Sequence, residues 1–210
     1  MALDTAGPEA CRQYVVEAGA QHPSVIDEAH VVDELFGIVN VPNGVWINEE
    51  GTIVRPAEPA WTRTIDYSNV PIPEDTPPER VELIELARGL RIEGDVYVSA
   101  IRDWVSNGSA SRFALTPDEV IARSHPRSEA IAAAAAQFEL GQHLHRAGFA
   151  EDAVFHFREA HRLHPSNWTY KRQAWNLVEP KQGSTPVYEG NWADDVRIIG
   201  PENYYPTFQP

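Results

Sequence analysis

A free thiol is the most reactive group in this sequence, and Cys11 is the one cysteine among its 210 residues. Gly7 and Pro8 stand shortly before it, and proline suits the first position of a helix. Because the start of a helix lowers the pKa of a thiol, Cys11 is a candidate for a reactive thiolate. The alternative is a half-buried, inert side chain. We favour the inert interpretation because no second cysteine can resolve a disulfide.

A second group of candidate residues is the set of histidines between residues 143 and 164. They are His143, His145, His156, His161 and His164. His161 and His164 are three residues apart and would share one face of a helix, a spacing that is open to zinc. No cysteine and no His-Glu-x-x-His pattern accompanies them, so a solvated polar face is the favoured interpretation. We expect neither a metal nor a cofactor.

Two pairs of acidic residues, Glu49-Glu50 and Asp194-Asp195, have the composition of an acid–base couple. The first pair falls in a predicted turn and the second in the C-terminal region, so both are expected to face water. The sequence contains neither a glycine-rich phosphate loop nor a Gly-x-Ser-x-Gly motif. We therefore predict no catalytic residue other than the weak candidate Cys11.

The charge balance restricts the classes of partner. The chain has 17 basic and 31 acidic residues, for a net charge of −14. Nucleic acids and anionic membrane surfaces attract basic patches, so neither is an expected partner. No apolar run reaches membrane-spanning length, and a single cysteine fits a reducing compartment. The chain as sequenced is therefore expected to be cytoplasmic, with a protein or peptide as its partner.

The elements that would position these groups include a predicted β-hairpin. Residues 45–47 set Val45 and Ile47 on one face against Trp46 on the other, as a strand does. Residues 48–51 form a turn, and residues 52–55 give a second strand. Pro42 comes directly before the hairpin. Proline cannot donate to a β-ladder, and a cis peptide bond is the usual reason for a proline in a tight turn.

The chain before the hairpin is predicted to alternate between strands and helices. The expected order is a strand end at 2–5, a helix at 8–19, a short strand at 23–27 and a helix at 29–36. The helix at 8–19 is expected to bury Tyr14, Val15 and Ala18. The helix at 29–36 has an apolar pattern.

Residues 36–47 (FGIVNVPNGVWI), the Glu-Gly turn at 50–51 and the Ile-Val pair at 53–54 resemble the second half of a thioredoxin-like domain. The nearest likeness is to the TlpA/ResA-type thiol–disulfide oxidoreductases. The resemblance covers roughly residues 2–55, about a quarter of the chain.

In that family the proline that corresponds to Pro42 is cis and presents the substrate backbone to the redox cysteines. The resemblance therefore implies a substrate-binding site at Val41, Pro42 and Asn43. Asn43 stands where the family usually has threonine, which is a departure at the substrate contact.

The resemblance also implies a strand and a Cys-x-x-Cys helix that would precede Met1. The missing strand would lie between the strand near Leu3 and the strand at Val45. Two explanations stay open. In one, the chain starts at a downstream methionine, after a motif with a selenocysteine read as a stop. In the other, another segment or chain completes the domain. We favour the first, and we expect this chain to be inactive as sequenced.

The remaining chain is predicted to be mostly helical. Prolines recur through residues 56–78, which is typical of an extended linker or wrapping loop. Helices are expected at 79–90, at 95–105, from 116 onward and at 168–178. The proline-rich and aromatic stretch 179–210 is expected to be an extended tail that lies on the body of the protein.

Residues 140–165 resemble one tetratricopeptide repeat. Gly141, Ala153 and Ala160 would allow two helices to approach closely, Phe157 would fill the space between them, and Pro165 would end the second helix. A lone repeat cannot bury its own face, so neighbouring helices are expected to cover it.

These observations predict an α/β, partly thioredoxin-like fold followed by an all-α region. The expected divisions are a thioredoxin-like domain at 1–55, a linker at 56–78, a helical region at 79–178 with a repeat near 134–167, and a tail at 179–210. Two functions are expected. One is a thiol–disulfide oxidoreductase relative without its redox motif. The other is a non-catalytic protein-binding module that uses the tetratricopeptide-like helices.

Overall fold

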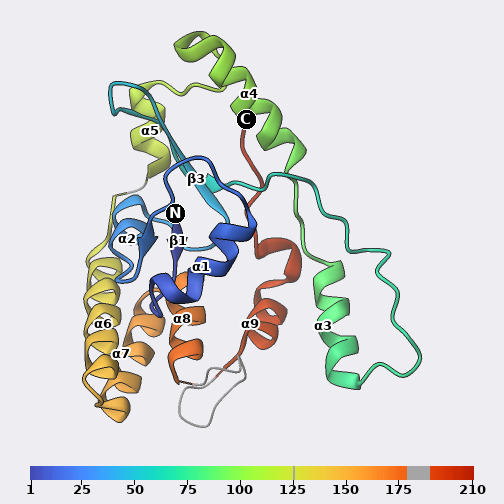
Figure 1. Cartoon of the computed structure of the whole chain (residues 1–210), viewed down its shortest axis with the longest axis vertical. Helices are drawn as coiled ribbons and strands as arrows, with labels where there is room; N and C mark the ends of the chain where they lie inside the picture. The colour runs from blue at the N-terminus through green and yellow to red at the C-terminus, as the bar shows by residue number, and fades with distance from the viewer. Residues whose placement is uncertain (125, 179–189) are drawn as a thin grey trace. The chain divides into compact units, whose positions relative to one another are not determined.

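The computed structural model describes residues 1–124, 126–178 and 190–210, and it is a mixed α/β chain that is mostly helical (Figure 1). Two compact units are present, and each is assembled from two stretches of chain. The first unit combines residues 1–39 with the described part of 126–189. The second combines the described part of 40–125 with residues 190–210. The predicted divisions follow the chain in order, whereas these units do not.

The first unit begins with a small parallel sheet and two helices. Strand β1 (Ala2–Leu3) pairs with β2 (Ile26–Asp27), and helices α1 (Pro8–Glu17) and α2 (Val31–Phe36) follow the two strands. The predicted elements are therefore present, with shorter bounds. The predicted buried face of α1 is wrong, because Tyr14 is 71% exposed.

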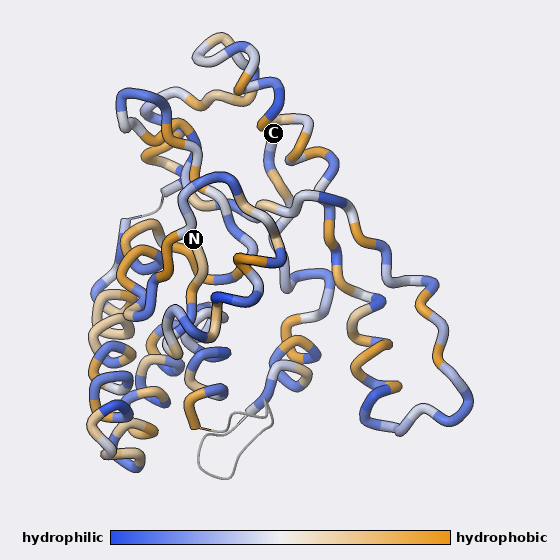
Figure 2. The backbone as a smooth tube through the Cα atoms, viewed as in Figure 1, coloured by the Kyte–Doolittle hydropathy of each residue, from blue (hydrophilic) through white to orange (hydrophobic). Residues whose placement is uncertain are grey.

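The other described residues of the first unit are mainly helical. Helix α6 (Glu129–Arg146) packs along α7 (Ala150–Leu163), and α7 contacts α8 (Trp168–Val178). Figure 2 lets the reader follow the alternation of apolar and polar residues along these helices. A Cβ added at Gly141 would lie 2.7 Å from the ring of Phe157, so the close approach predicted for this hairpin is present. The repeat family itself stays a prediction.

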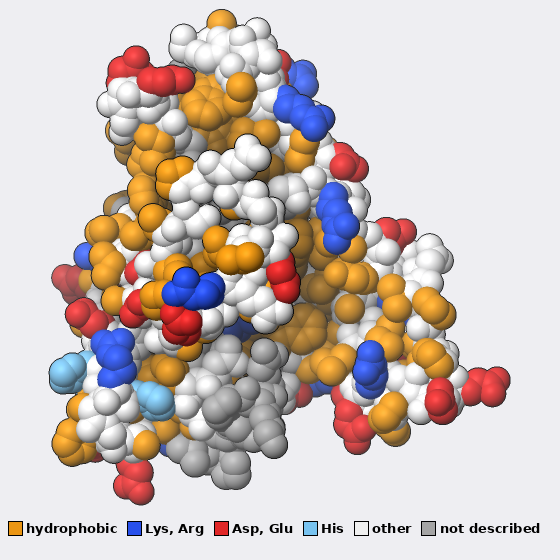
Figure 3. Space-filling model, in the orientation of Figure 1, with side chains coloured by type: hydrophobic (Ala, Val, Ile, Leu, Met, Phe, Trp, Pro, Cys, Tyr) orange, Lys and Arg blue, Asp and Glu red, His pale blue; other side chains and the backbone are white. Residues whose placement is uncertain are grey.

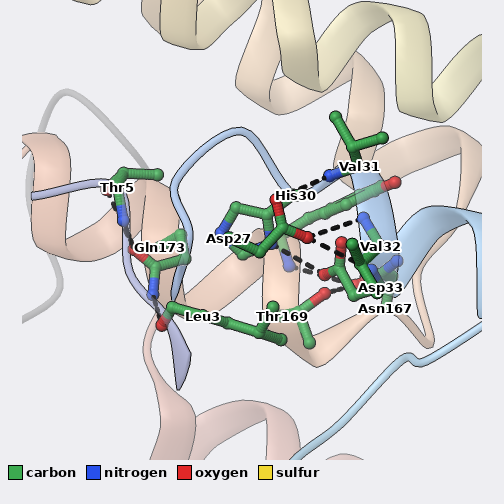
Figure 4. Close-up of polar contacts among 11 residues, drawn as sticks. Leu3, Thr5, Asp27, His30, Val31, Val32, Asp33, Asn167, Thr169 and Gln173 are labelled. Carbon is green, nitrogen blue, oxygen red and sulfur yellow. Dashed lines mark hydrogen bonds and ion pairs between the residues drawn. The ribbon is translucent and has the colours of Figure 1, made fainter. Parts of the chain in front are cut away.

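Helix α8 also completes the edge of the small sheet. The carboxamide of Gln173 accepts a hydrogen bond from Thr5 Oγ1 at 3.0 Å, and its Nε2 donates to the Leu3 carbonyl at 3.4 Å (Figure 4). A side-chain amide offers one donor and one acceptor, as a strand residue does. Gln173 therefore occupies an edge of β1 that would otherwise be open.

The second unit contains the predicted hairpin. Strand β3 (Asn43–Ile47) pairs in antiparallel fashion with β4 (Ile53–Pro59), and the Val41–Pro42 peptide bond is cis, as expected. Strand β4 runs four residues into the segment predicted to be a linker. It can contain prolines because the register shifts between the Gly44–Glu58 and Trp46–Arg55 pairs, which places Pro56 at a bulge.

Helices complete the second unit. They are α3 (Pro78–Arg88), α4 (Asp95–Asn107), α5 (Pro117–Ser124) and α9 (Trp192–Ile199), with short 3₁₀ turns at Gly108–Ala110 and Pro201–Asn203. The core gathers Trp46, Tyr97, Ala100, Phe113 and Phe208. The predicted start of α5 is confirmed, because Thr116 and Glu119 exchange hydrogen bonds.

The C-terminal stretch is partly different from the prediction. Residues 179–189 of the expected tail lie outside the described residues. Residues 192–199 form helix α9 instead of an extended segment, because Asn191 caps the helix through the backbone N–H of Asp194. The aromatic residues Tyr204, Tyr205 and Phe208 are buried, as the predicted contact with the body requires.

The four described strands form two separate two-stranded sheets, β1–β2 and β3–β4. A common sheet of thioredoxin type is not present among the described residues, so the thioredoxin-like arrangement stays a prediction.

Candidate functional site

Helix α2 buries Asp33 and exposes two of its apolar residues, Val31 and Leu35. Asp33 is 0% exposed, whereas Leu35 is 70% exposed and Val31 is also exposed. The apolar pattern predicts the helix correctly, but the face that is turned inward carries a carboxylate. Burying a charged group is costly unless other groups compensate for it.

The start of α2 is held by Asp27, which ends strand β2. One carboxylate oxygen accepts a hydrogen bond from the Val31 N–H at 3.0 Å, and the other accepts from the Val32 N–H at 2.6 Å (Figure 4). The first N–H groups of a helix have no partner within the helix. Asp27 supplies partners from a buried position and thereby joins the strand to the helix.

His30 lies between these two acids in the chain and bonds to the second. Its Nδ1 is 2.7 Å from Asp33 Oδ2, and the residue is 3% exposed. The backbone of His30 is left-handed, with φ of 57°. A residue other than glycine rarely adopts this conformation, and such residues are concentrated at functional sites.

Two aromatic rings from the helical hairpin region pack against His30. The His30 ring meets Phe138 edge-on, with centroids 5.2 Å apart, and Phe138 stacks on Tyr170 at 4.2 Å. Burial and the nearby Asp33 carboxylate raise the pKa of the Tyr170 phenol. The imidazole is therefore fixed in orientation by an acid on one side and by rings on the other.

Two polar atoms in this network have no hydrogen-bond partner among the described residues. They are His30 Nε2 and Asp33 Oδ1, and both are buried. Leaving a buried donor or acceptor unpaired costs about 1–3 kcal/mol. Buried polar atoms without a partner are uncommon in native proteins.

That surface is an open hollow of about 310 Å³ between α2 and α6, here named the α2–α6 groove. Arg127 forms an ion pair with Glu34, and both residues line the hollow. The lining residues are Ala29, His30, Val31, Glu34, Arg127, Ala132, Ala135, Ala136, Phe138, Glu139 and Tyr170. The groove thus combines methyl groups and aromatic rings with a few charged side chains, a mixture that is typical of ligand sites.

The predicted thiol site has no support from its surroundings. Cys11 is 6% exposed, and burial, with smaller effects of Asp4 and Glu28, raises the pKa of its thiol. The predicted lowering of the Cys11 pKa by the helix start is therefore wrong, because removal of the thiol from water raises the pKa by more than the helix start lowers it. The inert interpretation of Cys11 fits the structure.

The predicted substrate-binding residues Val41, Pro42 and Asn43 belong to the second unit, whereas Cys11 belongs to the first. Val41 is exposed and donates its N–H to Asn40 Oδ1 at 2.9 Å. The Pro42 carbonyl accepts from the Ala60 N–H at 3.3 Å, and Asn43 opens strand β3. These contacts hold the hairpin, and a substrate role for the three residues stays a prediction.

The predicted histidine cluster is dispersed over several interactions. His145 bonds to the Leu177 carbonyl at 3.0 Å, and His156 bonds to Gln137 at 2.5 Å. Burial lowers the pKa of His164. Figure 3 shows histidine side chains at the surface of the face drawn there. No group of three or more potential metal-ligating side chains is found within the described ranges.

The acidic pairs also have ordinary surroundings. Glu49 and Glu50 are exposed in the hairpin turn. Asp194 lies in the first turn of α9 and pairs with Arg197 at 2.6 Å. Neither pair forms an acid–base couple with a described partner.

Sequence reasoning missed the groove residues His30, Arg127 and Tyr170. It also missed Asp27 and Asp33, two buried acids at α2 that do not line the groove. One signal was available in the sequence. Asp27, His30 and Asp33 follow one another at intervals of three, across the predicted boundary between a strand and a helix. The other two residues are nearly 100 positions or more away, so only the folded chain brings them to the same place.

Comparisons with family models, with curated proteins and with solved structures gave no match for this chain. In residues 1–124, 126–178 and 190–210, no helix is both long enough and apolar enough to cross a lipid bilayer.

Proposed function

We propose that this chain is a redox-silent relative of the thioredoxin-like oxidoreductases and that it works as a protein-binding module. The binding site in this proposal is the α2–α6 groove, in which the tetratricopeptide-like helix α6 meets the α/β part of the first unit. The observation that carries the proposal is the groove itself, which places buried, unpartnered polar atoms next to exposed apolar residues.

The redox-silent part of the proposal depends on Cys11. Thiol–disulfide exchange needs an accessible thiolate and, for turnover, a second thiol. Cys11 is buried, the pKa of its thiol is raised, and the sequence has no other cysteine. The purified chain is expected to show no reduction of insulin disulfides above the rate with dithiothreitol alone. A measurable catalytic rate would contradict this part of the proposal.

The binding part depends on the shape of the groove. Ala136 lines the groove on α6, and Ala133 lies on the same helix but does not line it. Ala136→Trp is expected to fill the groove and abolish binding of groove ligands, whereas Ala133→Trp is expected to leave binding intact. An array of short peptides, read by fluorescence anisotropy against the full chain and both variants, tests this. Peptides that bind all three proteins equally would place the site elsewhere.

A further inference from the structure

The second unit has an open hollow of its own, of about 320 Å³, between the turn of the β3–β4 hairpin and the last turn of helix α4. It is here named the turn–α4 hollow. Its lining residues are Asn48, Glu49, Glu50, Val54, Trp104, Val105, Gly108 and Ser109. Each of them is exposed or partly exposed, so a ligand from solution can reach all of them.

An indole forms one wall of this hollow. The ring of Trp104 stacks on that of Trp46, with centroids 5.1 Å apart and an angle of 27° between the planes. Trp46 is 2% exposed and does not line the hollow, so Trp104 is the member of the stacked pair that a ligand can touch. The face of an indole is electron-rich and attracts cations more strongly than the ring of tyrosine or phenylalanine does.

The charges at the hollow also favour a cation. Glu49 and Glu50 bring two exposed carboxylates to the lining, which contains no lysine, arginine or histidine among the described residues. Within residues 1–124, 126–178 and 190–210, neither carboxylate has an ion-pair partner. The chain as a whole carries a net charge of −14. A positively charged ligand is therefore attracted to this face of the hairpin turn.

The core of the same unit contains a cation bound in the way that the hollow would allow. The guanidinium of Arg55 lies over the Trp46 ring, 5.3 Å from its centroid. It also donates to both carboxylate oxygens of Glu58, from Nε at 2.9 Å and from Nη2 at 3.0 Å. A planar guanidinium can stack on an indole and bind a carboxylate with two parallel bonds, whereas an ammonium is a point charge. At the hollow, Trp104 and the acids of the turn offer the same two kinds of group.

We propose that the turn–α4 hollow binds an arginine side chain of a peptide partner. The guanidinium stacks on Trp104 and donates its paired N–H bonds to the carboxylates of Glu49 and Glu50. The aliphatic stem lies on Val54 and on Val105, which is 76% exposed. The hollow belongs to the second unit and the α2–α6 groove to the first, so this inference goes beyond the proposed function and does not depend on it.

The test titrates the full chain with four blocked tripeptides. Ac-Gly-Arg-Gly-NH₂ carries the proposed ligand group, and its citrulline analogue keeps the planar group without the charge. The lysine analogue keeps the charge without the planar group, and the trimethyl-lysine analogue offers the indole a cation without N–H donors. Binding is followed by the ¹H–¹⁵N signal of the Trp104 indole, which is assigned by its loss in Trp104→Phe.

The expected result is a saturable shift of the Trp104 indole signal by the arginine peptide. Its affinity should be at least about tenfold higher than that of the citrulline peptide and at least about threefold higher than that of either lysine peptide. The double variant Glu49→Gln, Glu50→Gln is expected to weaken arginine binding about fivefold. The control double variant Glu79→Gln, Glu85→Gln removes two exposed carboxylates from α3, outside the hollow, and should change the affinity by less than about twofold.

A second pair of variants tests the place of binding. Ser109 is exposed and lines the hollow, so Ser109→Trp is expected to fill it and to abolish binding of the arginine peptide. Ser106 is exposed on α4 but does not line the hollow, so Ser106→Trp is expected to leave binding intact.

The arginine assignment is wrong if the citrulline or lysine peptide binds as tightly as the arginine peptide, or if the trimethyl-lysine peptide binds more tightly. It is also wrong if the two double variants behave alike. The hollow is not the site if the arginine peptide gives no saturable shift of the Trp104 indole signal or still binds Ser109→Trp. Ala136→Trp, which fills the α2–α6 groove, should leave arginine binding unchanged, so that failure of one proposal leaves the other standing. Loss of arginine binding in Ala136→Trp would overturn the assignment to the hollow.

Discussion

Gly141 on α6 faces the ring of Phe157 on α7 so closely that no side chain fits between them. A Cβ at Gly141 would lie 2.7 Å from Cδ1 and Cε1 of the ring, and Phe157 is fully buried. Helix α6 carries one wall of the candidate groove, and its packing on α7 therefore depends on a glycine in the middle of a helix, where glycine is otherwise unfavourable.

We expect Gly141→Ala to lower the stability of the chain. Alanine gains about 1 kcal/mol in helix propensity, but overpacking at a buried ring costs about 1–3 kcal/mol. Urea unfolding of the full chain measures the balance. Phe157→Leu combined with Gly141→Ala should recover part of the loss, and strictly additive effects of the two changes would contradict the steric explanation.

Arg55 makes a second prediction possible, because its guanidinium is 0% exposed and fully engaged. It donates to Glu58 at 2.9 Å, to the Phe113 carbonyl at 2.7 Å and to the Gln209 carbonyl at 2.5 Å. Arg55→Met leaves the part-buried Glu58 carboxylate and two carbonyls without their donor. We expect a loss of about 3–5 kcal/mol in the free energy of unfolding.

The matched control is Arg102→Met, which removes an exposed arginine from α4. Its effect should stay within about 0.5 kcal/mol. Equal effects of the two variants in urea or thermal unfolding would show that the buried guanidinium does not hold the C-terminal residues in place.

Cys11 is expected to react slowly with alkylating reagents. Burial raises the pKa of the thiol, so less thiolate is present at neutral pH than for an ordinary cysteine. The rate of iodoacetamide labelling of the folded chain should rise with pH and reach its midpoint above that of a cysteine in the urea-unfolded chain. A midpoint below the unfolded value would identify a reactive thiolate and revive the redox interpretation.

His164 should make the folded state sensitive to acid. Burial lowers its pKa below the ordinary value of 6.5, so the unfolded chain binds more protons than the folded chain in this range. The contribution of neutral His164 to the free energy of unfolding is therefore fully present above the unfolded pKa and is lost as the pH falls through the folded pKa. His164→Gln should reduce the loss of stability between about pH 7 and pH 5.

His143→Gln serves as the control for this pH dependence, because His143 is exposed on α6. The midpoint of urea unfolding is measured at several pH values for the wild-type chain, His164→Gln and His143→Gln. The role given to His164 would be wrong if the wild-type chain and His164→Gln lost stability in parallel.

The sequence by itself determined the local elements of this protein. The apolar periods, the Thr116–Glu119 capping pair and the prolines predict α1 to α5, α8 and the turn of the β3–β4 hairpin close to their observed bounds, because each signal acts within a few residues. Strand β4 continues four residues beyond the predicted strand, and α9 replaces a segment that was predicted to be extended. The close contact at Gly141 was also predicted, since small residues at helical spacing allow two helices to approach closely.

Only the tertiary structure decided which groups meet. Asp27, His30 and Asp33 are near one another in sequence, but Phe138, Arg127 and Tyr170 come from distant segments, and their meeting depends on the packing of α2, α6 and α8. The burial of Cys11 and of Asp33 was likewise a property of the folded chain. Burial and the electrostatic environment of a group depend on everything packed around it, whereas a local pattern reports only the preference of its own segment.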